Sequence, residues 1–296
     1  MCLQGYPEYP DHSREVPVSA AQDQRTYRSR MLPLTDRLSR LPYWLLVALL
    51  LAVIMIWVVV SNPDYRIIFN AVRQGVWTTI YVSVISYVCA IVVGLLLALM
   101  RVYRNRLTQE VSSLIVEVVR GVPMLVLLYF ISFVGAPALV DLINWVGTPL
   151  INGGLMTELN VRQVNFTARA ILALSVGYGA FVSEIFRAGI ESIEKEQREA
   201  AEVAGATYRQ TMRYILLPQA VRNILPALGN ELIAILKDSA LVSVLGVQDI
   251  TQLGKVYSAS TFRFFETYSI VALLYLMMTL GLAMIVRWLE QRMVLE

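Results

Sequence analysis

The sequence predicts an all-helical integral membrane protein with about six transmembrane helices. Of its 296 residues, 57% are hydrophobic and only 16% are charged, and the mean hydropathy is +0.59. Soluble domains carry about 25% charged residues. The apolar residues also form long runs with few charges, and about 20 such residues cross a bilayer as a helix.

The first expected span is Tyr43–Val60, with aromatic residues near both ends, where the membrane interface lies. A polar, arginine-rich stretch precedes it, and we interpret residues 1–42 as an arm in the cytoplasm. A signal peptide places its apolar region much nearer the start of the chain. The sequence therefore predicts a retained transmembrane helix over residues 43–60.

Five further apolar runs are expected to cross the membrane. They are Gly75–Met100, Gly121–Val140 (as part of a helix that extends back toward Gln109), Phe166–Ser183, Ile224–Val247 and Ser269–Val286. Residues 135–165 are expected to form an external insertion, because Pro137, Pro149 and the Asn-Gly-Gly at 152–154 are turn signals.

The basic residues predict the orientation of the chain. Lysine and arginine concentrate before residue 43, at 101–106, at 191–222 and after residue 286. Because cytoplasmic loops collect such residues, both termini and the 191–222 loop are expected in the cytoplasm. This placement accounts for the net charge of +3 without nucleic acid as a partner.

The chain lacks the residues that several kinds of chemistry require. The single histidine, His12, lies in the N-terminal arm, and two cysteines are too few for a disulfide scaffold. The chain has no phosphate-binding G-x-x-x-x-G-K-[ST] motif. We therefore expect no catalytic residues, metal site or cofactor in this chain, and energy for uphill transport would come from another subunit or an ion gradient.

One charged, alanine-rich segment separates two apolar runs: EAAEVAGATYRQTMRYILLP, from Glu199 to Pro218. It is expected to form a short helix from about residue 193, a stop at Gly205 and a second helix capped by Thr207. The second helix is expected to end before Pro218. The alanine face suits close docking to another surface, but a loop helix without a partner is an equally good interpretation.

The segment resembles the Glu-Ala-Ala (EAA) loop of ABC importer permeases. The matching residues are Glu199, Ala200, Ala201, Gly205, Leu217 and Pro218. Other stretches resemble the polar amino acid branch of that family, the histidine/glutamine type: VRGVPMLVLLYF (119–130), FVSEIFRAGIESI (181–193), LPQAVRNILPALGNELI (217–233) and LKDSALVSVLGV (236–247). The resemblance covers roughly residues 75–287, and we assign a permease domain to 75–290.

The resemblance implies a type I ABC importer core of five helices plus one extra N-terminal helix, in the bacterial inner membrane. It implies a second permease chain, identical or paralogous, and a dimer of ATPase subunits that binds ATP and magnesium. It also implies that residues 191–222 couple to the ATPase, and that a binding protein outside the membrane delivers an amino acid. The extra helix and the 135–165 insertion depart from the compact core.

Charged residues inside apolar runs are candidate contacts to the solute, since charges in a bilayer are costly. These candidates are Glu117, Arg120, Glu184, Lys237 and Asp238. The alternative is mutual neutralisation, because Glu117–Arg120 and Glu184–Arg187 are spaced i,i+3. We favour that alternative for Glu184 and leave both open for Arg120, Lys237 and Asp238. Glu231 is interpreted as a gate or structural contact.

Two other classes of protein compete with the permease interpretation. A gradient-driven secondary transporter often contains an inverted repeat, and none is evident here. A membrane enzyme would need catalytic residues that this chain lacks. Copurification of an ATPase subunit would distinguish an ABC permease from both.

Overall fold

The computed structural model describes residues 43–102, 105–155, 157–193 and 195–294. The predicted arm over residues 1–42 lies outside the described residues. The chain divides into two compact units with a boundary between Ile54 and Met55. The described part of the first unit is the beginning of helix α3 (Tyr43–Ser61), which covers the first expected span.

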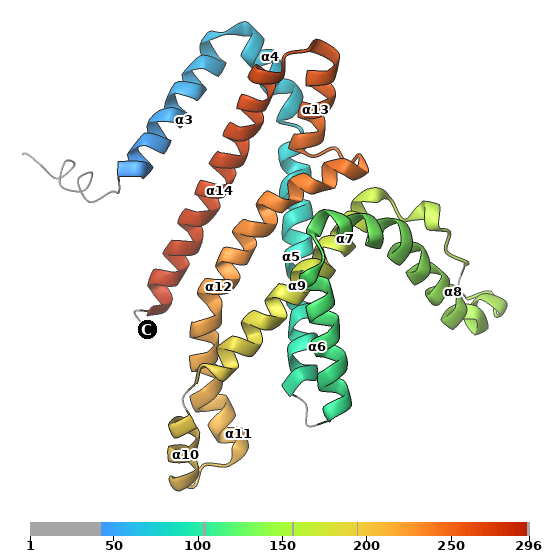
Figure 1. Cartoon of the computed structure of the whole chain (residues 1–296), viewed down its shortest axis with the longest axis vertical. Helices are drawn as coiled ribbons and strands as arrows, with labels where there is room; N and C mark the ends of the chain where they lie inside the picture. The colour runs from blue at the N-terminus through green and yellow to red at the C-terminus, as the bar shows by residue number, and fades with distance from the viewer. Residues whose placement is uncertain (1–42, 103–104, 156, 194, 295–296) are drawn as a thin grey trace, which may run out of the picture. The chain divides into compact units, whose positions relative to one another are not determined.

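In the part of the chain that the structure describes, every regular element is a helix, so the predicted all-helical fold is confirmed (Figure 1). In chain order, the second unit contains α4 (Pro63–Val72), α5 (Gly75–Val102), α6 (Arg106–Gly121), α7 (Met124–Phe130), the π-helix η1 (Ile131–Gly135), α8 (Ala136–Asn152), the 3₁₀ helix η2 (Val161–Gln163), α9 (Phe166–Glu191), α10 (Lys195–Val203), α11 (Tyr208–Gln210), the π-helix η3 (Thr211–Leu216), α12 (Leu217–Asp238), the 3₁₀ helix η4 (Ser239–Leu245), α13 (Ile250–Thr261) and α14 (Phe264–Val294).

Four helical stretches among the described residues are long and apolar enough to cross a membrane. They are Pro63–Arg101, Met124–Asn152, Phe166–Glu191 and Phe264–Arg292. Helix α12 contains amide and charged side chains and is not in that set, although it runs beside α9 and α14. The expected number of six spans therefore stays a prediction.

The centre of the second unit is the contact between α5 and α9, where two glycines let the backbones approach. A Cβ on Gly94 would lie 2.6 Å from the side chain of Val182, and a Cβ on Gly179 would lie 2.7 Å from Val93. Apolar side chains from α5, α7, α9, α12 and η4 fill the core around this contact. Because a larger side chain has no room at either glycine, α5 and α9 form one tightly packed pair.

A second buried region joins α4, α13 and α14. Asp249 is fully buried at the N-terminus of α13, where its carboxylate accepts hydrogen bonds from the backbone N–H groups of Thr251 and Gln252. The hydroxyl of Tyr275 on α14 also donates to Asp249, over 3.1 Å. Burial raises the pKa of the Asp249 carboxyl, and these hydrogen bonds oppose the shift. Asp249 thus ties α13 to α14 at the end of the unit that contains α4.

The expectation of one continuous helix from about Gln109 into the run Gly121–Val140 is wrong. Helix α6 ends at Gly121, Val122 is extended, and α7 begins at Met124. Pro123 is the cause, because a proline ring disfavours helical geometry in the residue before it. Arg120 therefore lies in the last turn of α6 and not in the middle of a span.

Two other boundaries differ from expectation. Residues 136–152, for which turn signals were noted, form helix α8, with Pro137 in its first turn, where proline is compatible with a helix. The turn signal at residues 152–154 holds, since α8 ends there and Gly154 has a φ of +72°. The run Ile224–Val247 is not one helix, because α12 ends at Asp238 and a 3₁₀ helix follows.

Candidate functional site

Helices α10 and α11 form a separate loop beyond the ends of α9 and α12 (Figure 1). Gly205 stops α10 as predicted, with a left-handed φ of +75°. The N–H of Ala206 donates to the carbonyl of Ala201 over 3.0 Å, the six-to-one hydrogen bond of a Schellman motif. A Cβ on Gly205 would contact nothing within 4 Å, so the backbone conformation, and not lack of space, favours glycine here.

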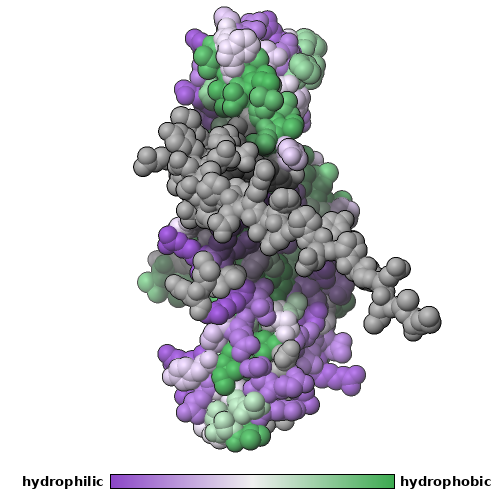
Figure 2. All heavy atoms as spheres, turned by 90° about the vertical axis from the view of Figure 1, so that its left-hand side faces the viewer, coloured by the Kyte–Doolittle hydropathy of each residue, from purple (hydrophilic) through white to green (hydrophobic). Residues whose placement is uncertain are grey.

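The Glu-Ala-Ala residues do not share one environment. Ala201 is buried, and α10 packs against η3, whereas Glu199, Ala200 and Gly205 are exposed. Val203, which the sequence analysis did not single out, is 90% exposed beside them. Figure 2 shows the α10–α11 end of the molecule, at the bottom of the view, as mostly hydrophilic, with a small hydrophobic patch at its tip. The signal in the sequence that could have indicated a docking surface is an apolar residue, Val203, within an otherwise charged and alanine-rich helix.

The second half of the loop differs from expectation. Thr207 does cap the next helix, since its Oγ1 accepts a hydrogen bond from the backbone N–H of Gln210 over 3.4 Å, and its own N–H donates to Gln210 Oε1 over 2.8 Å. The helix does not end before Pro218, however. It continues through α11 and η3 directly into α12, and Pro218 lies in the first turn of α12. Leu217 and Pro218 are exposed on this connection.

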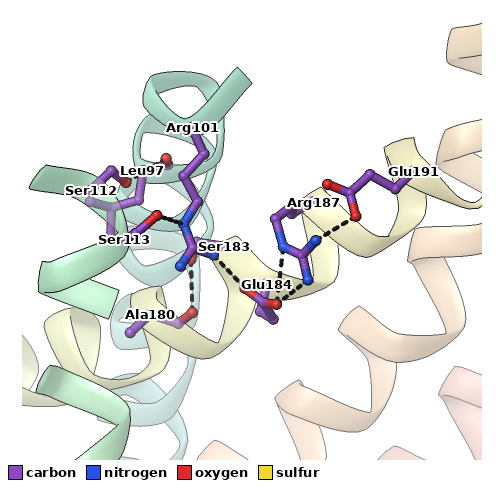
Figure 3. A network of polar contacts seen from close by, with 9 residues as sticks. All are labelled: Leu97, Arg101, Ser112, Ser113, Ala180, Ser183, Glu184, Arg187 and Glu191. Atoms are coloured by element: carbon purple, nitrogen blue, oxygen red, sulfur yellow. Dashed lines mark hydrogen bonds and ion pairs between the residues drawn. The ribbon is translucent and has the colours of Figure 1, made fainter. Parts of the chain in front are cut away.

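An ion-pair network joins three helices near the end of α9 that leads to α10 (Figure 3). Arg101 of α5 pairs with Glu184 of α9, and its Nε donates to Ser113 Oγ of α6 over 3.2 Å. Glu184 also pairs with Arg187, which pairs with Glu191 in the last turn of α9. The side chain of Arg101 is only 10% exposed and that of Glu184 26%. The network therefore fastens α5 and α6 to the helix that precedes the loop.

The expected i,i+3 pairing of Glu184 and Arg187 is present in this network. The expected pairing of Glu117 and Arg120 is absent, because no nitrogen of Arg120 lies within 4 Å of Glu117 in the described part of the chain. Arg120 instead places its guanidinium carbon 5.6 Å from the ring centroid of Phe181 on α9. Glu117 is exposed on α6.

A cavity of about 250 Å³ lies among α6, α7, α9 and α12. Its lining is apolar except for three polar side chains, and it consists of Val119, Val122, Met124, Leu127, Gly177, Tyr178, Phe181, Glu231, Ala234 and Asp238. The hydroxyl of Tyr178 donates to Asp238 Oδ2 over 2.8 Å. A small, mainly apolar cavity with a few polar groups is typical of a ligand site.

The cavity includes one of the five predicted solute-contact residues, Asp238. Arg120 lies next to the lining through Phe181. Lys237 is exposed outside it, and Glu184 is held in the ion-pair network. Glu231, interpreted from the sequence as a gate or structural contact, proves to be a lining residue.

The apolar helical spans, the cavity between helices and the separate helical loop define a multi-pass membrane protein. Residues 90–295 match the family described as binding-protein-dependent transport system inner membrane component. The chain belongs to this family, and the resemblance seen in its sequence is confirmed.

Relatives and solved structures agree with this assignment. The chain is 36% identical over 233 residues to the glutamine transport system permease protein GlnP of Escherichia coli K12. The aligned residues cover 78% of this chain and 97% of GlnP. It is 33% identical over 225 residues to the probable glutamine ABC transporter permease protein GlnM of Bacillus subtilis, covering 76% and 94%. The crystal structure of an amino acid ABC transporter with histidines matches with a TM-score of 0.64 and 34% identity over 79% of this chain and 97% of that chain. The chain is thus the permease subunit of an ABC importer.

Proposed function

We propose that this chain forms the membrane pore of an ATP-driven importer of polar amino acids in the bacterial inner membrane. The observation that carries the proposal is the presence of both an interhelical cavity and a Glu-Ala-Ala loop in a chain 36% identical to a glutamine permease. A dimer of ATPase subunits supplies ATP hydrolysis, a second permease chain completes the pore, and a binding protein delivers the solute. Both termini and the α10 loop face the cytoplasm.

In this proposal the loop of residues 191–222 docks to an ATPase subunit. The exposed residues Glu199, Ala200, Val203 and Gly205 offer a small surface with one large apolar side chain, that of Val203. The helix after Thr207 continues into α12, which carries Glu231 and Asp238 of the cavity. Because these helices are continuous, movement of the docked loop can be transmitted along them to the cavity wall. Affinity purification of the tagged chain tests this assembly, because an ATPase subunit should copurify.

Arg120 is proposed to bind the carboxylate of the amino acid, and Asp238 its ammonium group. A zwitterion leaves water only when both charges find partners. The guanidinium of Arg120 can bind two carboxylate oxygens at once, and it lies against Phe181 of the cavity lining. Glu117 and Lys237 remain weaker candidates, since neither lines the cavity, whereas Arg120 at least contacts Phe181 of its lining.

We expect Arg120→Lys to lower solute uptake by about tenfold, because lysine keeps the charge but loses the second hydrogen bond. Uptake into proteoliposomes and basal ATPase activity should be measured together. Lys237→Arg is the matched control, and it should leave uptake nearly unchanged. Equal loss of uptake and basal ATPase activity in Arg120→Lys would instead assign Arg120 a structural role.

The extra helix over residues 43–60 is proposed to lie outside the solute path. Its run of apolar residues offers no polar lining for a solute. We expect uptake to persist when residues 43–60 are replaced by an unrelated helix of leucine and alanine, with the arm before it retained. Loss of uptake by a variant that still inserts at normal levels would contradict this placement.

A further inference from the structure

We infer that the cavity among α6, α7, α9 and α12 selects a cationic amino acid, one with a positively charged side chain such as arginine or lysine. This inference rests on the proposed function, and it adds the charge class of the solute. The structural basis is the placement of two carboxylates in one cavity, together with a single guanidinium at its edge.

Glu231 and Asp238 are separated by seven residues, so both lie on one face of α12, with Ala234 between them in the same lining. Seven residues of helix correspond to about 10.5 Å along the axis. The two carboxylates therefore extend from backbone positions about two helical turns apart. An amino acid with a second cation at the end of a flexible side chain can place one cation near each.

Neither carboxylate has a cationic partner in the part of the chain that the structure describes. No lysine or arginine nitrogen lies within 4 Å of Glu231 or Asp238. Tyr178 donates one hydrogen bond to Asp238, which leaves the Oδ1 atom of Asp238 available. A carboxylate removed from water is costly without a cation or hydrogen-bond donors. A ligand that supplies two cations would compensate both groups.

The apolar part of the same lining suits the hydrocarbon part of such a side chain. Leu127 and Met124 come from α7, and Gly177 keeps space beside Met124, since a Cβ there would lie 2.7 Å from the Met124 sulfur. With Arg120 on the solute carboxylate, three charged groups of the chain would meet three charged groups of the solute. A neutral side chain, as in glutamine, would leave one carboxylate without a counter-charge.

The test is competition binding to the detergent-solubilised complex of this chain with its ATPase, using radiolabelled arginine. Unlabelled lysine should compete well, whereas citrulline, a neutral analogue of arginine with nearly the same shape, and glutamine should compete at least tenfold more weakly. Glu231→Gln should weaken arginine binding by about tenfold and leave citrulline binding unchanged. Glu110→Gln is the matched control, because Glu110 is an exposed carboxylate on α6 outside the lining.

Two results would overturn the inference and leave the proposed function intact. The first is glutamine or citrulline binding to the wild-type complex as tightly as arginine. The second is equal loss of arginine and citrulline binding in Glu231→Gln, which would make Glu231 a structural residue. Asp238→Asn gives an independent variant if Glu231→Gln does not assemble. Failure of every amino acid to bind and to be transported would overturn the proposed function as well.

Discussion

Replacing Gly205 by glutamate is expected to abolish transport while the chain still inserts into the membrane. A residue with a Cβ in the left-handed conformation costs about 1–2 kcal/mol, and the glutamate adds a charge and bulk to the exposed face of the loop. ATPase binding should weaken, or hydrolysis should continue without uptake. Uptake in proteoliposomes and ATPase copurification measure these two outcomes.

Two controls separate backbone strain from loss of docking. Gly205→Asn keeps a residue that tolerates the left-handed region, so it should retain most of the activity. Gly154→Glu puts the same change at another exposed glycine with a similar φ, +72°, at the end of α8. That variant should assemble with the ATPase normally. A normal rate of transport by the Gly205→Glu complex would rule out docking through this loop.

Reversing the charge of Arg101 is expected to cause the second large loss. Arg101→Glu would place two carboxylates together in a mostly buried site, and breaking a buried ion pair costs about 3–5 kcal/mol. The end of α5 at Arg101 and the adjoining part of α6 would then separate from α9, and thermal stability in detergent and transport should both fall. Arg106→Glu is the control, because Arg106 forms an exposed i,i+4 pair with Glu110 that contributes little.

The charge swap tests the pair itself. Arg101→Glu combined with Glu184→Arg should recover part of the lost thermal stability, because the interhelical attraction is restored with reversed sign. Recovery should be incomplete, since Arg187 would then face a second arginine on α9. No recovery at all, with normal insertion of the double variant, would show that the contact to Ser113 and not the ion pair holds the helices together.

The long helices were predictable because their sequences are apolar for longer than a bilayer requires. Helices α5, α9 and α14 contain the runs expected for them. The break at Pro123 was missed because the run stays uncharged across it, and hydropathy contains no information on backbone angles. Helix α8 was missed because prolines were interpreted as turn signals, although a proline in the first turn is compatible with a helix.

The candidate site was predictable only where its geometry is local. The stop at Gly205 and the pairing of Glu184 with Arg187 depend on residues within one or two turns. The partnership of Arg101 with Glu184 joins positions 83 residues apart and depends on how α5 packs against α9. The same holds for the cavity, which needs the relative placement of four helices before Glu231 and Asp238 can be recognised as its lining.

The π-helix over Thr211–Leu216 adds a residue to the connection between the loop of residues 191–222 and α12. A π-turn contains one residue more than an α-turn over the same hydrogen-bonded span, so each of its residues advances less around the axis than the roughly 100° of an α-helix. Loss of one residue from this segment can therefore be absorbed by a return to α-helix, with nearly the same orientation of α10 relative to α12. The same loss within α12, an α-helix, would turn everything before it by about 100°. Alignments of permease loops should therefore allow a single-residue gap at residues 211–216 and none within α12.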